Sequence, residues 1–344
     1  MRMFKSVILA SLIFIFVLTL NCLADELNDS IETLSAIQNG KVLEPQVLNE
    51  SLELEISGFG DFSHIVQNNI NKYGIRQLEI DLEKKLAPKM VIIAAVAYSN
   101  ESETFELGEF NVDFHLFGSD GDHFHLVSGI DHSGIKVGQF DVPFGLDWRF
   151  YPSIDRKTVT GPLVIENTHK GWNDNGVQAF IDNRWFNAVA YGVNGFGYDD
   201  VEMKLAVGGR MGLTPNEIIE VGCSQASFLN GNKKIDMSMS GIDLQLNYQA
   251  LSLKGEYIVH KMNLTENNAI KNSGFYCQAM YGFKKYFYVT RYGAFTETDS
   301  GKDSIRRFSN CLGIEIMKDC ELRCEYQVNS DDSNASLMQV VVAL

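Results

Sequence analysis

Apolar and polar residues alternate along most of this chain, in short segments separated by polar stretches. A clear example is Ile242–Tyr248, with the sequence Ile-Asp-Leu-Gln-Leu-Asn-Tyr, which is followed after two residues by the alternating segment Leu251–Val259. A period of two places successive side chains on opposite faces of a β-strand. One face of each predicted strand is therefore apolar, and the other carries Asp, Asn, Gln, Glu and Lys. The pattern predicts an all-β protein.

The alternating segments predict about 16 antiparallel strands, with lengths near the roughly 9–11 residues of a tilted membrane strand. Residues 117–133 contain a turn signal, Ser119–Asp122, and leave room for a further strand. The predicted strands are 51–58, 74–86, 89–99, 103–117, 134–141, 175–183, 185–195, 202–213, 217–228, 236–248, 250–262, 274–285, 287–297, 307–317, 320–329 and 335–344.

The connections between these strands alternate in length, as they do in outer-membrane barrels with short periplasmic turns and longer external loops. A soluble sandwich of two sheets has no reason to keep this parity, so we predict a closed transmembrane β-barrel with a polar lumen. Two connections depart from the parity: Asn100–Ser102 is short and 117–133 is long. The short set is Leu86–Pro88, Asp182–Arg184, Thr214–Asn216, Gln249–Ala250, Tyr286 and Lys318–Asp319; the long set is Gly60–Tyr73, Asn194–Asp200, Asn230–Lys233, Asn263–Ser273, Thr298–Ser304 and Ser330–Asn334.

One predicted strand, 236–248, breaks the alternation. Its apolar face changes from Met237 and Met239 to Ile242 and Leu244. A β-bulge at Gly241 would restore a single apolar face.

The N-terminal residues have the order of a secretory signal peptide. Arg2 and Lys5 precede the apolar run Val7–Leu20, and Ala24 offers a small residue for cleavage. We expect residues 1–24 to be removed on export. The alternatives are a membrane anchor, for which the run is short, and a lipoprotein modified at Cys22.

The rest of the chain is predicted to contain a short N-terminal segment, 25–50, and the barrel, 51–344. Residues 25–50 do not alternate and have apolar residues at helical spacing, which predicts a short periplasmic helix. The most apolar later stretch, Met90–Tyr98, is far too short for a membrane helix. Any spanning part of the mature chain must therefore be a barrel, because only helices and closed barrels satisfy their backbone in lipid.

Charge and cysteine content narrow the function. The formal net charge is −15, and removing the two positive charges of Arg2 and Lys5 leaves −17, which argues against a nucleic-acid partner and favours cations in a pore. The remaining cysteines are odd in number and scattered, so they do not form a disulfide framework. We expect Cys320 and Cys324 to be strand residues, with a local disulfide between them as the alternative. The five are Cys223, Cys277, Cys311, Cys320 and Cys324.

The segment between the fifth and sixth predicted strands carries the most distinctive motif. Val137–Leu146 contains a Gly-Gln-Phe strand end that runs into Pro-Phe-Gly, and it is followed by Gly161–Leu163 and Gly171–Val177. Over roughly residues 134–180 the chain resembles the phosphate-selective porin O and P family and related Gram-negative outer-membrane porins. The resemblance implies a 16-stranded barrel, often trimeric, that passes small solutes by diffusion.

Residues 142–174 occupy the position at which porins of this size carry a loop that folds into the lumen. The segment is long enough to be functional, and we expect Phe144 and Trp172 to pack it against the wall. Charged side chains at a constriction set ion preference, although each can instead be a solvated or loop-stabilising charge. The loop mixes both signs, whereas anion-selective members of the family are expected to carry a dense run of Lys and Arg. The candidates are Arg149, Asp155, Arg156, Lys157, Glu166, His169, Lys170 and Asp174.

Other motifs do not define an enzyme, a metal site or a cofactor. His123 and His125 share a strand face, with His115 and His132 near in sequence, but no carboxylate base accompanies them as a zinc enzyme requires. Asp120–Asp122 lacks the spacing of a calcium loop, and no serine lies in a Gly-x-Ser-x-Gly motif.

We therefore expect a passive porin in the outer membrane of a Gram-negative bacterium. Its partners would be outer-membrane lipid, small hydrophilic solutes or ions and, from the resemblance, two further copies of the chain in a homotrimer. The alternatives are an exported carbohydrate-binding or scaffold domain and a non-conducting structural barrel. Outer-membrane barrels commonly end in an aromatic residue, and this chain ends in Leu344.

Overall fold

A computed structural model describes residues 54–68, 70–87, 89–99, 104–117, 132–196, 205–229, 235–265, 268–297 and 304–344. The predicted signal peptide 1–24, the predicted helix in 25–50 and any extra strand within 118–131 lie outside the described residues.

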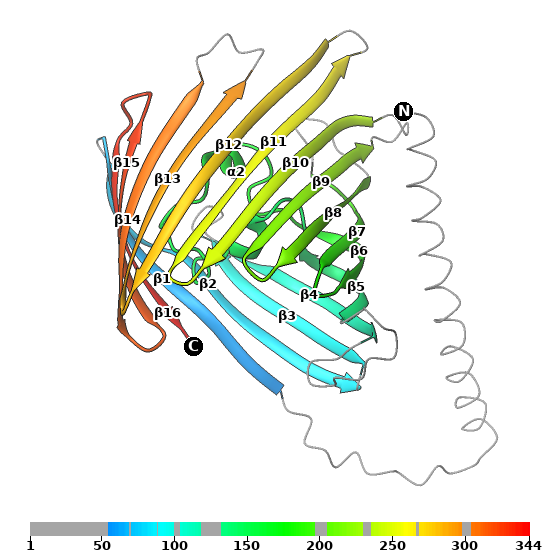
Figure 1. The fold of residues 1–344 in the computed structure, drawn as a ribbon. Helices are drawn as coiled ribbons and strands as arrows, with labels where there is room; N and C mark the ends of the chain where they lie inside the picture. The colour runs from blue at the N-terminus through cyan, green and yellow to red at the C-terminus, as the bar shows by residue number, and fades with distance from the viewer. Residues whose placement is uncertain are drawn as a thin grey trace, which may run out of the picture. The chain divides into compact units, whose positions relative to one another are not determined.

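The chain forms a closed barrel of sixteen antiparallel strands, which confirms the predicted fold (Figure 1). Each strand pairs with its neighbours in sequence, and β16 closes the barrel on β1 with Phe59 opposite Ala343. Closure leaves no unpaired strand edge. The strands are β1 (Leu54–Gln67), β2 (Ile70–Ala87), β3 (Met90–Ser99), β4 (Thr104–Phe117), β5 (His132–Asp141), β6 (Asn173–Asp182), β7 (Phe186–Val193), β8 (Leu205–Asn216), β9 (Ile219–Leu229), β10 (Ile235–Tyr248), β11 (Leu251–Thr265), β12 (Asn268–Phe283), β13 (Tyr286–Glu297), β14 (Ile305–Met317), β15 (Cys320–Asn329) and β16 (Ala335–Ala343).

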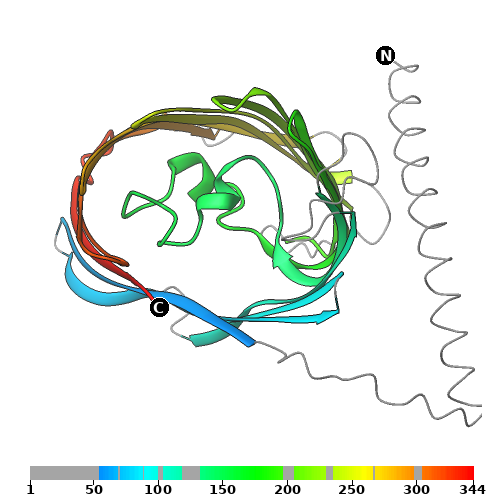
Figure 2. The ribbon, with the colours of Figure 1, turned by 60° about the horizontal axis from the view of Figure 1, so that its bottom comes forward.

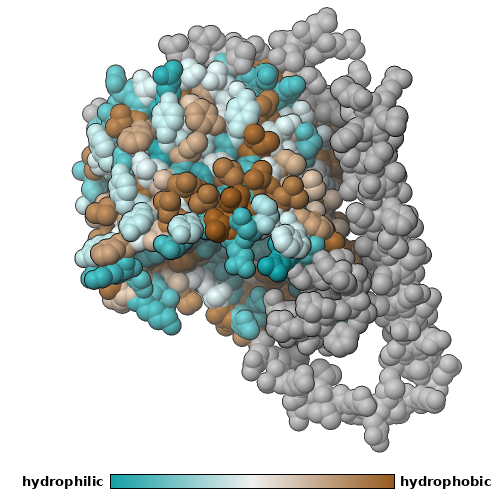
Figure 3. Space-filling view, in the orientation of Figure 1, coloured by the Kyte–Doolittle hydropathy of each residue, from teal (hydrophilic) through white to brown (hydrophobic). Residues whose placement is uncertain are grey.

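The alternation in sequence becomes an apolar outer face and a mainly polar inner face. On β15, Tyr326 points outward and is 50% exposed, whereas Arg323 and Glu325 point inward and are buried. Hydrophobic residues gather across the middle of the outward face (Figure 3). Because the same faces were predicted for this strand from its period of two, the pattern was a sound guide to orientation.

The predicted loop Gly60–Tyr73 is wrong, because β1 continues to Gln67 and β2 already begins at Ile70. Arg76 and Gln77 together oppose Asp61, and the register shifts there. This bulge lies within the predicted strand 74–86. The residues that the prediction missed lie mainly in β1, where Phe59 is buried on the inner face and Phe62 is 50% exposed on the outer one, so the sequence shows no single apolar face there.

The predicted bulge at Gly241 is also wrong. β10 pairs with β11 without a register shift from Met237 to Tyr248. Met237 and Met239 point inward and are fully buried, whereas Ile242 points outward and is 61% exposed. The strand is regular, and the change of apolar face arises because the inside of the barrel is apolar at this point.

The predicted loop Asn263–Ser273 is much shorter than expected, since β11 runs to Thr265 and β12 begins at Asn268. No described helix is long and apolar enough to cross a membrane. The cysteines Cys320 and Cys324 are free, so the local disulfide considered for them does not form.

The connection between β5 and β6 folds into the barrel, where Figure 2 shows it inside the ring of strands. We call residues 142–172 the inner loop. It contains a 3₁₀ turn, η1 (Asp147–Phe150), and one helical turn, α2 (Leu163–Glu166). The predicted loop 142–174 ends two residues earlier than expected, because β6 begins at Asn173.

Candidate constriction site

An apolar cluster attaches one side of the inner loop to the wall. Phe144 and Trp172 are buried in it, as predicted. The Trp172 ring stacks on Phe228 of β9 with centroids 5.1 Å apart. A Cβ atom on Gly241 would lie 3.4 Å from the Phe144 ring, so the missing side chain leaves room for that ring. The wall residues of the cluster are Phe140, Tyr191, Val193, Ala206, Ala226, Phe228, Met237, Met239, Ile258, Met262, Tyr276 and Phe295.

The Pro-Phe-Gly motif forms a tight turn against β9 and β11. Gly145 has a φ of +69°, a conformation that favours glycine. Its backbone N–H donates to Ser224 Oγ at 2.9 Å. A Cβ atom at Gly145 would lie 2.0 Å from Oε2 of the buried Glu256, whose other oxygen, Oε1, accepts a 2.9 Å hydrogen bond from the Tyr276 hydroxyl. Both the conformation and the close approach therefore require glycine.

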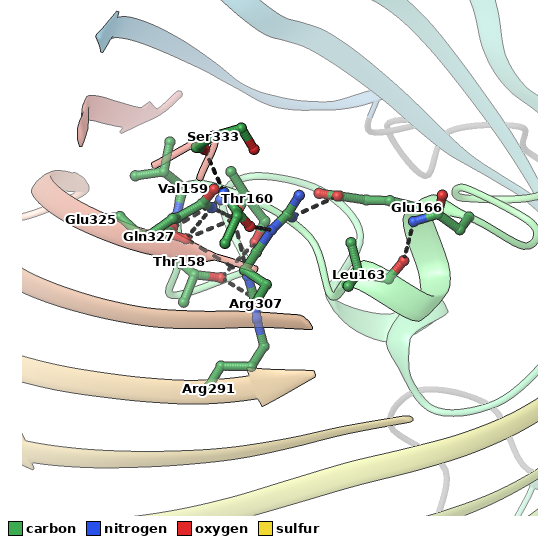
Figure 4. Close-up of polar contacts among 12 residues, drawn as sticks. Thr158, Val159, Thr160, Leu163, Glu166, Arg291, Arg307, Glu325, Gln327 and Ser333 are labelled. Carbon is green, nitrogen blue, oxygen red and sulfur yellow. Dashed lines mark hydrogen bonds and ion pairs between the residues drawn. The ribbon is translucent and has the colours of Figure 1, made fainter. Parts of the chain in front are cut away.

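A polar network attaches residues 153–160, which we call the tip of the inner loop, to β13 and β15 (Figure 4). The carboxylate of Glu325 accepts hydrogen bonds from Val159 N at 2.6 Å, Thr160 N at 3.0 Å and Thr160 Oγ1 at 2.7 Å. Arg291 donates to Thr158 Oγ1 and to Thr160 O, each at 3.0 Å. These groups are buried, and hydrogen bonds to charged partners are the stronger ones in such an environment.

Arg323 is the second wall residue that holds this tip. Its guanidinium is fully buried and donates to the carbonyl oxygens of Ser153, at 2.6 Å, and of Arg156. Glu321 on the same strand accepts from Arg323 Nη2 at 2.6 Å and balances its charge. Backbone carbonyl groups of the loop are therefore satisfied by hydrogen bonds from a side chain of the barrel wall.

Three of the predicted charged residues of the loop are paired with the wall. Arg149 contacts Glu220 at 2.9 Å, and Glu166 contacts Arg307 at 2.7 Å. Lys157 forms an ion pair with Glu321. These residues hold the loop in place, which is the loop-stabilising alternative considered for them.

Arg156 and His169 are buried within the loop. Burial lowers the pKa of Arg156, and Arg76 nearby lowers it further. Burial also lowers the pKa of His169 from its ordinary 6.5 to about 4, with a smaller contribution from His260. The His169 ring packs edge-on against Phe144 with centroids 5.2 Å apart, so His169 acts as a neutral packing residue near neutral pH.

The remaining three predicted residues differ from one another. Asp155 and Lys170 are exposed. Partial burial of its carboxyl group raises the pKa of Asp155, while the positive charges of Lys157 and Arg323 lower it by a smaller amount. Asp174 is a strand residue of β6, and its Oδ2 accepts a 2.5 Å hydrogen bond from Gly195 N. The loop thus contributes few unpaired charges to the lumen.

The wall segment from β2 to β5 presents carboxylates that the inner loop does not neutralise. Glu79, Asp81, Glu109 and Asp141 point inward, are only partly buried and interact with one another electrostatically. Within the described residues, their positive partner is Lys136, which lies 3.5 Å from Glu109. We call these four residues the acidic wall.

The loop contacts are made mainly with the other strands. The apolar cluster involves β7 to β13 together with Phe140 of β5, and the polar network involves β13 to β15. A smaller apolar cluster joins Val159 of the loop to Ala335 and Leu337 of β16 and to Ile65 of β1. On β2, Arg76 and Gln77 bond to the loop through Val159 O and Ser153 N. The partly exposed acidic wall therefore lies on the side of the lumen where the loop is least attached.

Solved structures with the same fold are outer-membrane proteins. The chain is similar to an anion-selective porin from Comamonas acidovorans, with a TM-score of 0.61, 13% identity, and coverage of 85% of this chain and 98% of that one. It is similar to OmpF of Salmonella typhi, solved with daunomycin, with a TM-score of 0.59, 10% identity, and coverage of 87% and 99%. It is also similar to a loop-deletion mutant of OmpT, an outer-membrane protein of Vibrio cholerae, with a TM-score of 0.60, 11% identity, and coverage of 85% of this chain and 99% of that one.

These likenesses define the class of fold: a porin-like barrel of the kind found in Gram-negative outer membranes. No family model matches the chain, and no curated protein matches its sequence. The resemblance to the phosphate-selective porin O and P family stays a prediction.

Proposed function

We propose that this protein is an outer-membrane porin through which small hydrophilic solutes diffuse between the inner loop and the acidic wall. The observation that carries the proposal is the one-sided attachment of the loop. Its contacts concentrate on β7 to β16, with fewer on β1 and β2, and the partly exposed carboxylates of the acidic wall lie on β2, β4 and β5. A polar, hydrated surface on that side supplies a path for solutes that carry their own water.

The proposed path prefers cations. Carboxylates that face a narrow lumen raise the local concentration of cations and repel anions. Several basic residues that could oppose this effect are neutralised, because Arg149, Lys157, Arg307 and Arg323 are each paired with a carboxylate. The acidic net charge acts in the same direction. We do not propose phosphate selectivity.

The apolar outward face supports contact with outer-membrane lipid, and the expected signal peptide supports export. A homotrimer is proposed by analogy with porins, among which a trimeric form of OmpT from Vibrio cholerae has been solved. No enzymatic activity is proposed.

A second candidate, a non-conducting barrel, rests on the dense packing of the inner loop. Apolar contacts and a buried polar network hold the loop from two sides. If the space along the acidic wall were closed to ions, the protein would serve as a structural barrel.

Liposome swelling separates the two candidates. Purified protein is reconstituted into liposomes, which are then diluted into isosmotic arabinose, lysine hydrochloride or sodium glutamate. The proposal predicts swelling in arabinose, faster entry of lysine than of glutamate, and co-fractionation of the protein with outer membranes. A folded protein that permits no swelling in any solute would support the non-conducting barrel.

A further inference from the structure

A pair of imidazoles lies on the inner face of β4 and β5, apart from the contacts of the inner loop. His115 Nδ1 and His132 Nε2 are 2.6 Å apart, and the two rings stack with centroids 4.8 Å apart and planes 18° from parallel. His132 is at the first position of β5, next to the end of the described part of the wall. At this distance one ring nitrogen donates a hydrogen bond to the other, and the tautomers of the two rings decide which one donates.

An aromatic ring on β6 supports the ring of His132. Phe180 on β6 packs edge-on against His132, with centroids 5.0 Å apart. A Cβ atom at Gly134 would lie 2.7 Å from the Phe180 ring, so glycine at this position admits the ring that supports His132. The two histidines are therefore held by β4, β5 and β6 together.

A buried carboxylate lies on the far side of His115. Asp113 Oδ1 is 3.9 Å from His115 Nε2, the nitrogen that does not face His132, and this oxygen has no hydrogen-bond partner within the described residues. Metal-binding histidines commonly direct their second nitrogen toward a carboxylate, which orients the ring and raises the basicity of the ligand. Asp113 lies on this side of His115, slightly beyond hydrogen-bond distance, so a small movement of either side chain would complete the contact.

We propose that His115 and His132 bind a divalent transition-metal ion, such as Zn²⁺ or Cu²⁺, with water completing its coordination and Asp113 positioning His115. Neutral imidazole nitrogen is a preferred ligand of both ions. A zinc ion bound to both rings at about 2.0–2.1 Å requires the two nitrogens to move to roughly 3.3 Å apart, a small rotation of either ring. Within the described residues no cluster of three metal-ligating side chains occurs, which is why water supplies the other positions.

The proposed metal site deepens the proposed function, because it identifies a divalent metal ion as a ligand that would bind in the lumen. The acidic wall, which includes Glu109 on β4 and Asp141 on β5, draws cations to the strands that carry the histidines. An ion bound at this place would narrow the lumen and add positive charge to it. This consequence rests on the proposed porin function, whereas the binding itself does not.

Isothermal titration of the purified, folded protein with Zn²⁺ tests the binding. We expect one Zn²⁺ per chain, lost in His115→Gln and in His132→Gln, and retained in His64→Gln, whose histidine is bonded to Asn71 instead. Asp113→Asn should weaken binding by about 10- to 100-fold. Retention of this binding in His115→Gln/His132→Gln, or its loss in His123→Gln/His125→Gln, would overturn the assignment.

Two further measurements separate loss of a metal ligand from misfolding, and the metal site from the proposed porin function. The EPR spectrum of the Cu²⁺-loaded protein should show nitrogen superhyperfine splitting that disappears in the His115→Gln variant, provided that variant retains the circular dichroism spectrum of the folded barrel. Conductance is measured on the same sample: Zn²⁺ binding in a protein that does not conduct would uphold the metal site and reject the porin. Absence of Zn²⁺ binding in a conducting protein would do the reverse.

Discussion

The guanidinium of Arg323 on β15 donates a 2.6 Å hydrogen bond to the carbonyl oxygen of Ser153 in the inner loop, 170 residues earlier in the chain. Arg323 is fully buried, so water cannot replace this bond if the side chain is removed. The tip of the inner loop therefore depends on a wall residue for the satisfaction of its backbone.

Arg323→Met should loosen the tip of the inner loop. Breaking a buried, paired charge typically costs about 3–5 kcal/mol, and here it also leaves the carbonyls of Ser153 and Arg156 without their donor. We expect a lower thermal unfolding temperature and larger, noisier single-channel conductance. Arg306→Met is the matched control, since Arg306 is exposed. Equal stability and conductance in both variants would contradict the role assigned to Arg323.

Gly145→Ala should disrupt the Pro-Phe-Gly turn. A non-glycine residue at a φ of +69° costs roughly 1–3 kcal/mol, and the added Cβ would also displace the carboxylate of Glu256. Gly192→Ala provides a control within β7, because a Cβ atom there meets nothing within 4 Å. We expect denaturant unfolding to show a clear loss of stability for Gly145→Ala alone. Similar curves for the two variants would show that the turn tolerates a side chain.

Acidification should weaken the docking of the inner loop through His169. Since its pKa falls from 6.5 to about 4 on folding, the folded protein binds fewer protons than the unfolded one between these values. The stability from this residue is fully present above pH 6.5 and declines as the pH falls toward 4, by at most about 1.4 kcal/mol per pH unit.

Thermal unfolding of wild type and His169→Gln across this pH range measures that contribution. The difference between their stabilities should shrink as the pH falls from 6.5 to 4, whereas the difference between wild type and His64→Gln should not follow this course. A constant difference between wild type and His169→Gln would show that His169 titrates normally.

Much of the barrel could be predicted from the sequence, because a period of two determines which side chains share a face. The alternation around Glu79 and Asp81 on β2, and around Arg323 and Glu325 on β15, placed these residues inward correctly. It failed in the outer part of β1, where Phe59 and Phe62 place apolar side chains on opposite faces, and at Gly241, where an apolar lumen resembles a change of face.

The roles of the residues at the candidate site were harder to predict from the sequence than the barrel. The motif around Phe144 and Gly145 located the inner loop, but the charged residues proposed within it mostly hold the loop to the wall. Their partners, such as Glu220 and Arg307, are far away in the chain, and nothing in a single sequence records which inward residue meets which loop residue. A signal that the sequence does contain is the alternation of Glu79 and Asp81 with apolar residues, which places both carboxylates on one face of β2.

Neutralising the acidic wall should reduce the proposed preference for cations. Glu79→Gln/Asp81→Asn removes two inward carboxylates with little change in shape, and the ratio of cation to anion permeability should fall severalfold. The matched control is Glu217→Gln/Asp319→Asn, which removes the same charge from exposed residues at two short turns. An equal effect of both double variants would assign selectivity to net charge instead of the acidic wall.

The most direct test of the account is the conductance of the purified wild-type protein in a planar bilayer under a salt gradient. We predict discrete conductance steps and a reversal potential of the sign for cation selectivity, which moves toward zero in Glu79→Gln/Asp81→Asn. Folded protein that gives no steps, or a reversal potential of the sign for anions, would contradict it.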